Sequence, residues 1–425
     1  MRILVVGGGG REHALCWRLA QNPAVERLYA APGNAGIAEV ATLVPVAAAD
    51  VQGIVEFAER ESVDLTVVGP EAPLVAGLAD EMQARGMAVF GPTRDAARIE
   101  GSKAWARWLC DRHDIPAPRS EAFEEVGPAL EYLNHLGPPY VVKADGIAAG
   151  KGVTVTDDIA EARRAIEDCL VRKVFGDAGL KVLIEEYLEG FEVSAMALTD
   201  GRTVLPLALV QDYKRALDGN EGPNTGGMGA FSPVPAVASA TESRIVEMIL
   251  RRAARALEAE GVRYRGVLFA GLMLTADGPR VLEFNCRFGD PETQALLPRL
   301  ASNFGELLLA CVEGNLSHHK LVWAEDATVA VVLASGGYPG SYESGKPIAG
   351  LEDAGGVHGV QVFHAGTVAR EGRVLTAGGR VLTVTATAPD LDEARRRAYE
   401  AVSTISFDGM TYRRDIAERV RQEAR

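Results

Sequence analysis

One short segment in the second half of the chain carries side chains that could bind a metal ion and a phosphate. Glu283, Asn285 and Arg287 alternate with other residues, and the preceding Asp277-Gly278 pair is typical of a hairpin turn. The pattern predicts a strand, in which residues two positions apart point to the same face. A carboxylate and an amide oxygen side by side suit Mg²⁺, which usually takes few protein ligands beside phosphate and water. Arg287 adds a planar donor fork for a carboxylate or phosphate.

An alternative for this segment is a strand end with a solvated acid and a surface arginine, and the three residue types alone do not decide between the two. Their surroundings favour a site, because polar groups that are costly to bury without partners stand in a segment apolar enough to be core. Cys286 could be a nucleophile, although a small buried apolar residue is the favoured interpretation.

A glycine-rich loop between two predicted strands favours a phosphate-binding flap. The strands cover 140–143 and 153–155, and Lys143 and Lys151 bracket the loop. The loop is not a P-loop, because Gly152 follows Lys151 where that motif has Ser or Thr. A strand–loop–strand hairpin can fold over phosphates, and the two lysines supply positive charge. A glycine-rich surface hairpin is the disfavoured alternative.

The N-terminal loop Gly7–Gly10 suggests a dinucleotide site, but its residues oppose that interpretation. The third glycine of G-x-G-x-x-G would fall at Glu12, and no acid closes the second predicted strand near Ala30. A milder prediction remains: the backbone N–H groups of the loop stand at the start of a helix, where they suit a phosphate.

Other segments hold polar groups that suit a nucleotide or a small substrate. Lys103 stands in the first turn of a helix predicted over 102–112, where an anionic partner and simple solvation explain it equally well. The segment 183–194 is interpreted as a hinge whose backbone could bind a purine edge, with Glu192 for ribose hydroxyls, an interpretation barely favoured over solvated acids. Two further segments rich in polar residues and glycine are 211–215 and 223–230.

Composition restricts the class of partner. The chain of 425 residues has a formal net charge of −14, which opposes nucleic acid or an anionic membrane as the main partner. Its 5 cysteines contain no C-x-x-C pair, which indicates reduced thiols rather than a zinc site or disulfides. The sequence predicts no leader segment and no membrane-spanning run. We therefore expect a cytoplasmic protein.

The sequence predicts an α/β and α+β protein of several domains. Strands that alternate with helices indicate an N-terminal doubly wound parallel sheet, whose ligands bind beyond the carboxyl ends of its strands. These strands are predicted at 3–6, 28–30, 65–68 and 87–90. Later strands are predicted at 204–210, 268–274, 329–333, 361–363 and 381–384, the last three in a small β-rich unit with a closing helix at 392–403. The predicted domains are 1–101, a linking helix at 102–122, two α+β units at 123–191 and 192–325, and 326–425.

Several motifs occur in an informative order. They are G-G-R-E-H-A at 9–14, G-P-E-A-P-L at 69–74, K-A-D-G-I-A-A-G-K-G at 143–152, G-P-N-T-G-G-M-G-A at 222–230, E-F-N-C-R-F-G-D-P-E-T-Q at 283–294 and F-H-A-G-T at 363–367. Together they resemble the glycinamide ribonucleotide synthetases, a family of the ATP-grasp superfamily, across the whole chain. Phe191 and Phe231 depart from the family pattern, which has a polar residue and a tyrosine there, and neither departure removes a proposed chemical group.

The resemblance implies an ATP-dependent ligase of purine biosynthesis that uses ATP and Mg²⁺ or Mn²⁺. ATP would phosphorylate the carboxylate of glycine, and the amine of 5-phosphoribosylamine would attack the acyl phosphate to give glycinamide ribonucleotide, ADP and phosphate. Such chemistry needs positioning and charge neutralisation more than a covalent nucleophile. The two α+β units would form the ATP-grasp core. We expect a monomer that acts on these small molecules, with no nucleic-acid or membrane partner.

The resemblance also implies roles for individual residues. The metal ligands would be Glu283 and Asn285. The catalytic residues would be Arg287, Asp212 and Lys143. ATP would be held by Lys103, Lys143, Gly150, Lys151, Gly152, Glu185, Glu186, Tyr187, Leu188, Glu192 and Leu272. Glycine and phosphoribosylamine would be held by Gly8, Gly9, Gly10, Glu71, Asp212, Asn224, Gly226, Gly227, Met228, Gly229, Arg287, Gly289, Asp290 and Pro291.

Two other classes of function remain open at this point. One is another ATP-grasp ligase with a different acceptor, against which the 222–230 motif counts. The other is a nicotinamide-dependent oxidoreductase, suggested by the first domain and opposed by Glu12 at the third glycine position.

Overall fold

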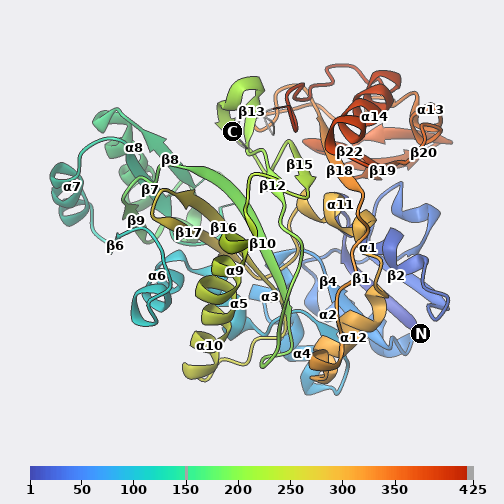
Figure 1. Cartoon of the computed structure of the whole chain (residues 1–425), viewed down its shortest axis with the longest axis horizontal. Coiled ribbons are helices and arrows are strands. Elements are labelled where there is room, and N and C mark those ends of the chain that lie inside the picture. The colour runs from blue at the N-terminus through green and yellow to red at the C-terminus, as the bar shows by residue number, and fades with distance from the viewer. Residues whose placement is uncertain (149–151, 419–425) are drawn as a thin grey trace.

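The N-terminal region is a parallel sheet with helices around it, as the alternating pattern predicts (Figure 1). The structure is a computed structural model that describes residues 1–148 and 152–418. The strand order is β3-β2-β1-β4-β5, with β1 Arg2–Gly7, β2 Arg27–Pro32, β3 Thr42–Leu43, β4 Leu65–Val68 and β5 Val89–Phe90. The helices are α1 Gly10–Ala20, α2 Val51–Arg60, α3 Glu71–Val75, α4 Leu78–Ala84 and α5 Arg94–Gly101.

Strand β1 shows why this sheet forms. Ile3, Leu4, Val5 and Val6 are all fully buried, as expected for a parallel sheet that is covered on both faces. Ile3 and Val5 belong to one hydrophobic core, whereas Leu4 and Val6 belong to another, because successive side chains point to opposite faces. Because β1 and β4 are parallel, the loops that follow them emerge at the same edge of the sheet, where ligands of such folds bind.

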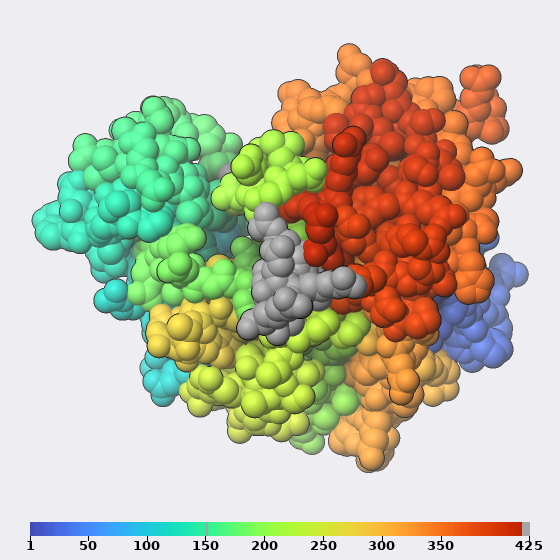
Figure 2. Space-filling view, turned by 45° about the horizontal axis from the view of Figure 1, so that its top comes forward, coloured from blue at the N-terminus to red at the C-terminus, as the bar shows by residue number. Residues whose placement is uncertain are grey.

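Helix α6 leads into a separate small sheet, which with its helices is called the lid below. The helix spans Lys103–Arg112, close to its prediction, and the Ser102 hydroxyl caps it by accepting a hydrogen bond from the Trp105 N–H. The lid sheet is antiparallel in the order β6-β9-β7-β8 and has a hydrophobic core of its own. Its elements are β6 Ser120–Phe123, α7 Val126–His135, β7 Tyr140–Ala144, β8 Val153–Thr156, α8 Ile159–Leu170 and β9 Val182–Glu185. In Figure 2 this teal region projects from the body of the molecule.

The central antiparallel sheet carries the predicted metal ligands on its edge strand. Its order is β11-β10-β16-β17, with β10 Phe191–Thr199, β11 Val204–Pro206, β16 Gly266–Thr275 and β17 Gly278–Asn285. The predicted hairpin is confirmed, since Thr275 pairs with Gly278 across the turn. The strand predicted over 204–210 is shorter than expected. It ends at Pro206, although the Leu207 N–H still donates to the Met196 carbonyl and Val210 forms an isolated bridge with Ser194.

A bulge in β17 sets which side chains face outward near the predicted metal ligands. Gly271 pairs with Glu283, whereas the next residue of β16, Leu272, pairs with Val281. Leu282 is therefore the extra residue, and its carbonyl is free to accept hydrogen bonds from side chains. The alternation resumes after it, so Glu283 and Asn285 share a face as predicted.

A third sheet joins the central region to the C-terminal region. Its order is β12-β15-β18-β22-β19, with β12 Gln211–Asp212, β15 Gly229–Ser232, β18 Ala327–Ala334, β19 Val360–His364 and β22 Arg380–Ala388. The pairing of β15 with β18 carries this sheet across the predicted boundary between 325 and 326. The other elements are β13 Arg215–Leu217, β14 Glu221–Asn224, α9 Ser239–Ile245, α10 Arg251–Ala259, α11 Glu292–Leu296, α12 Phe304–Glu313, α13 Leu351–Gly355, β20 Thr367–Arg370, β21 Arg373–Thr376 and α14 Leu391–Thr404.

Two expectations from composition can be compared with the structure. The cysteines are all buried and none forms a disulfide. Within residues 1–148 and 152–418, no helix is both long and apolar enough to cross a bilayer.

Candidate active site

A cavity of about 480 Å³ lies where the N-terminal region, the lid, the central sheet and the C-terminal region meet. Predicted site residues in its lining are Glu71, Lys103, Gly152, Asp212, Asn224, Gly226, Glu283, Asn285, Arg287 and Asp290. Lining residues that sequence reasoning missed include Arg11, Glu100, Lys214, Glu292, Tyr338 and Arg380. The cavity thus gathers side chains from distant parts of the sequence, which is typical of a ligand site between domains.

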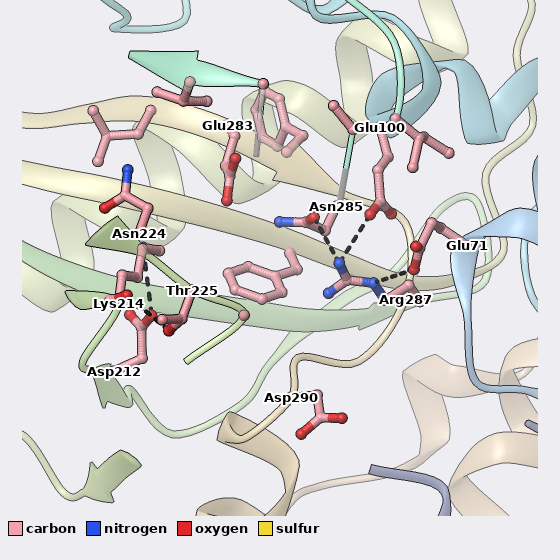
Figure 3. A pocket seen from close by; sticks show the side chains of 18 of the residues that line it. Glu71, Glu100, Asp212, Lys214, Asn224, Thr225, Glu283, Asn285, Arg287 and Asp290 are labelled. Atoms are coloured by element: carbon pink, nitrogen blue, oxygen red, sulfur yellow. Dashed lines mark hydrogen bonds and ion pairs between the residues drawn. The ribbon is translucent and has the colours of Figure 1, made fainter. Parts of the chain in front are cut away.

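Glu283 and Asn285 lie side by side on β17 along this cavity (Figure 3). Burial raises the pKa of Glu283, but the charges of Lys214, Lys143, Lys103 and Arg287 outweigh burial and hold the pKa below its usual value. The carboxylate therefore stays ionised, as a metal ligand must.

These two oxygens fit Mg²⁺ as part of a ligand shell. The Asn285 Oδ1 accepts a hydrogen bond from Arg287 Nη2 at 3.0 Å, and an amide oxygen has a second lone pair for a cation. In the described part of the chain, no group of three or more His, Cys, Asp or Glu side chains could hold a metal ion. Protein atoms would thus supply only part of the shell, as is usual where phosphates and water complete the coordination of Mg²⁺.

Arg287 is held by partners from two regions. Its Nη2 contacts Glu100 Oε1 at 2.9 Å and its Nε contacts Glu71 Oε2 at 3.2 Å, and both acids belong to the N-terminal region. Its Nη1 donates to the Phe288 carbonyl at 3.3 Å. Burial lowers the pKa of the guanidinium, but Glu100 and Glu71 outweigh it, so the pKa lies above its usual value. The side chain is therefore a fixed cation in the cavity wall.

Lys214 lies beside Asp212, across the cavity from Arg287 (Figure 3). Lys214 Nζ forms ion pairs with Glu192 Oε2 at 2.5 Å and Asp212 Oδ2 at 3.5 Å. The Ser194 hydroxyl lies 3.3 Å from Asp212 Oδ1 and 3.1 Å from Glu292 Oε1. Glu192, predicted to bind ribose hydroxyls, is thus paired with a lysine in this structure. One lysine stands among more than one buried acid, so negative charge is in excess here.

We predict that Glu292→Gln stabilises the protein more at pH 8 than at pH 5. Burial, followed by the charge of Asp212, raises the pKa of Glu292 from 4.5 to about 7. A raised pKa means that the folded state binds this proton more tightly. The folded state therefore loses stability as the pH rises from 4.5 towards about 7, with no further loss above that. Glutamine removes this loss.

Thermal unfolding of wild type and Glu292→Gln at pH 5 and at pH 8 measures this effect. We expect the Tm of the variant minus the Tm of wild type to be larger at pH 8 than at pH 5, by about 2 °C or more. Glu258→Gln on the exposed face of α10 is the matched control, with the same Tm difference from wild type at both pH values. A pH-independent difference for Glu292→Gln would contradict the prediction.

The lysines predicted to bind phosphate are engaged with protein atoms. Lys143 Nζ lies 2.6 Å from Glu185 Oε2 and 3.1 Å from the Leu282 carbonyl oxygen. Arg107 completes this buried group, with its Nε at 2.6 Å from Glu185 Oε1 and its Nη2 at 2.6 Å from the same Leu282 oxygen. Burial raises the pKa of Glu185, but Lys143 and Arg107 outweigh it and hold the pKa at about 2. These contacts join the lid to α6 and to the bulge in β17.

Lys103 and the flap stand beside this group. Lys103 Nζ donates to the carbonyl oxygens of Asp145 at 3.3 Å and Gly146 at 2.9 Å. Gly152 lines the cavity, and Gly150 and Lys151, both predicted to contact ATP, lie outside the described residues. Lys103 therefore faces the start of the glycine-rich loop, as a phosphate-binding lysine would.

The N-terminal glycine loop already uses one of its donors. The Gly9 N–H donates to Glu12 Oε2 at 2.6 Å. Glu12 occupies the position at which a dinucleotide motif would carry its third glycine. Gly8 approaches its neighbours closely, since an added Cβ would lie 2.5 Å from the Gly33 carbonyl oxygen. The Gly9 donor is thus occupied, and the loop packs closely against Gly33 and beside Asp290.

The C-terminal region supplies one wall of the cavity through Arg380. Its Nη1 donates to the carbonyls of Gly226 and Asp290, each at 2.6 Å, and its Nη2 lies 3.3 Å from Asp290 Oδ2. The Tyr338 hydroxyl accepts a hydrogen bond from the Gly226 N–H at 3.0 Å. Gly227 has φ +113, and an added Cβ would lie 2.4 Å from Pro291 Cδ, so this position requires glycine. The second glycine-rich loop is therefore positioned from the C-terminal region.

The remaining predicted residues lie outside the lining of the cavity. Leu272 is fully buried in the sheet, whereas Leu282 of the bulge lines the cavity. Glu186 pairs with Arg119 and Arg280, and Tyr187 is exposed. The predicted residues outside the lining are Gly8, Gly9, Gly10, Lys143, Glu185, Glu186, Tyr187, Leu188, Glu192, Leu272, Gly227, Met228, Gly229, Gly289 and Pro291.

Comparisons with known proteins cover almost the whole chain. Models of phosphoribosylglycinamide synthetase match residues 1–100 with its N domain, 101–293 with its ATP-grasp (A) domain and 328–419 with its C domain. The phosphoribosylamine–glycine ligases of Allochromatium vinosum and Vibrio parahaemolyticus are 51% and 48% identical, each over 99% of this chain and 98% of the relative.

Solved structures agree with this result. The phosphoribosylamine–glycine ligase of Thermotoga maritima has a TM-score of 0.85 and 35% identity, over 98% of this chain and 100% of its own. A biotin carboxylase of Campylobacter jejuni, in a beta-gamma-ATP complex, has a TM-score of 0.74 at 14% identity, over 97% of this chain and 93% of its own. At that identity the second likeness shows the fold alone.

Proposed function

Because this chain belongs to the phosphoribosylglycinamide synthetase family and has phosphoribosylamine–glycine ligase activity in purine biosynthesis, we propose that the cavity described above is where the ligation occurs. ATP phosphorylates the glycine carboxylate, and the amine of 5-phosphoribosylamine attacks the acyl phosphate to give the amide, ADP and phosphate. The observation that carries this proposal is the convergence of Glu283, Asn285 and Arg287 on one cavity that all regions of the chain line.

We propose that Glu283 and Asn285 hold Mg²⁺ against the phosphates of ATP. When bound, the ion neutralises phosphate charge and orients the nucleotide. Arg287 adds a fixed positive charge for the transferring phosphoryl oxygens, where preorganised donors lower the barrier most. Lys143 and Lys103 supply further charge from the lid side, after exchanging their present oxygen partners for phosphate oxygens.

The nucleotide base and the acceptor occupy opposite sides of this charge centre in our proposal. The backbone of Glu186–Leu188 receives the purine edge, and the flap around Gly152 covers the phosphates. Asp212 and Asn224 face glycine and the amine, which the cavity lining supports. Phosphoribosylamine lies towards Gly8–Gly10 and Glu71, beside Arg11.

ADP release in the presence of Mg²⁺ and ATP tests the assignment of substrates. We expect release with glycine and phosphoribosylamine together, and only background release with either alone. Omission of Mg²⁺ is the control for the metal. Release with a different carboxylate and amine, but not with this pair, would retain the ATP-dependent ligation and overturn the substrates.

We also propose that the protein acts in the cytoplasm as a monomer. Its charge of −14 disfavours nucleic acid and anionic membranes as partners. Light scattering coupled to size-exclusion chromatography tests the oligomeric state. A mass near 45.1 kDa is expected, and a mass near twice that value would contradict the monomer.

A further inference from the structure

The hydrogen bonds of Arg287 leave little of its guanidinium free for a ligand. A guanidinium has five N–H donors. Nε donates to Glu71, Nη2 donates to both Glu100 and Asn285, and Nη1 donates to Phe288. Within the described residues, one Nη1 donor is left uncommitted. The direction of that donor is set by the groups that hold the other four.

Of the two acids that hold Arg287, Glu100 is the more firmly fixed. Its Oε1 accepts from Arg287 Nη2 at 2.9 Å, and its Oε2 accepts from the backbone N–H of Cys286 at 2.7 Å. The two oxygens of Glu100 therefore bind two consecutive residues, Cys286 and Arg287, which directly follow β17. The Glu100 side chain is 9% exposed, whereas that of Glu71 is 24% exposed. Glu100 also lies near the end of α5, so it connects the N-terminal region to the cavity wall.

We propose that Glu100 is a positioning residue for Arg287, which it holds so that the uncommitted donor faces the reacting phosphoryl or carboxylate oxygens. The inference rests on the function proposed above and names a residue that acts through another residue rather than on substrate. A shift of the guanidinium would lower the stabilisation of the transition state more than it lowers the affinity for ATP, because ATP has other contacts in the proposed site.

Glu100→Gln, in the wild-type and the Arg287→Lys backgrounds, tests this proposal. Glutamine keeps the shape but has one acceptor oxygen, so it cannot serve both Arg287 and the Cys286 N–H. We expect kcat to fall roughly tenfold to hundredfold in the wild-type background, with KM for ATP changed less than about twofold. In the Arg287→Lys background the same change should cost less than about twofold, because the group being positioned is already lost.

Asp95→Asn on the same helix is the matched control, since its carboxylate forms an exposed pair with Arg98, and it should leave kcat unchanged. Equal losses from Glu100→Gln in both backgrounds would overturn the proposal, as would an unchanged kcat. A merely structural role would lower Tm without a kcat-specific loss in the folded protein. If Glu100→Gln does not fold, Glu100→Asp replaces it, with the same expectations.

Failure of the substrate assignment would remain distinguishable. In that case wild type would release ADP only with another pair of substrates, and the same double-mutant comparison on that reaction would still decide the role of Glu100.

Discussion

Glu283→Ala is expected to lower the rate of ADP release about a thousandfold or more, with the fold intact. The carboxylate stays ionised because four cationic side chains face it, and we propose that it is one of two protein ligands for Mg²⁺. Its loss leaves Asn285 as the remaining ligand. Lys214 keeps Glu192 and Asp212 as partners, so the cluster beside it retains its ion pairs.

The measurement is ADP release over a range of Mg²⁺ concentrations, with Tm recorded in parallel. Asp277→Ala, at the exposed turn of the same hairpin, is the control and should behave as wild type. Wild-type turnover by Glu283→Ala at ordinary Mg²⁺ concentrations would refute the metal assignment. Recovery at high Mg²⁺ would support it, because a weakened site needs more ion.

Arg287→Lys should lower kcat by about a hundredfold to a thousandfold, although the charge is kept. The three nitrogens of the guanidinium donate hydrogen bonds to four groups from two regions, which are Glu71, Glu100, Asn285 and Phe288. Lysine offers three donors from a single atom and cannot span these positions, so its ammonium would settle nearer one acid. Steady-state kinetics with both substrates measures the loss.

Arg244→Lys provides the matched comparison, because this arginine makes an exposed hydrogen bond to the Asp277 carbonyl at 3.2 Å. It should change kcat by less than about twofold, as is usual for substitutions at exposed sites. Near-normal kcat in Arg287→Lys would mean that charge alone suffices and that the planar group is not required.

The sequence allowed the metal-site candidates to be found because their geometry is local. Period-2 alternation after a turn determines that Glu283 and Asn285 share a face, and no distant contact is needed to see it. The parallel sheet of the N-terminal region was predictable for the same reason, since each strand and loop carries its own signal.

Glu100 was missed because its role depends on a contact across 187 positions of sequence. It stands in an ordinary helical segment, and no local pattern distinguishes it from a solvated acid. Lys214 gave a partial signal as a member of a polar cluster, but its pairing with Glu192 depends on the packing of separate strands.

The bulge in β17 is a third feature that the sequence does not reveal. It makes Leu282 the extra residue of its strand, and Leu282 lines the cavity. A bulge inserts one residue on one strand, and apolar residues on both sides of it give no sign of the change in register. A shift in register of this kind can be recognised only once the pairing of the two strands is known.

The pairing of Ser120 with Glu185 means that the chain enters and leaves the lid sheet on neighbouring strands. The lid sheet therefore takes no strand from the other sheets and has a core of its own, and its buried ion pair Glu185–Arg107 ties it to α6. The C-terminal region is built differently. Its β18 pairs with β15 of the central region on one side and with its own β22 on the other, so a substitution in β18 acts on both regions at once.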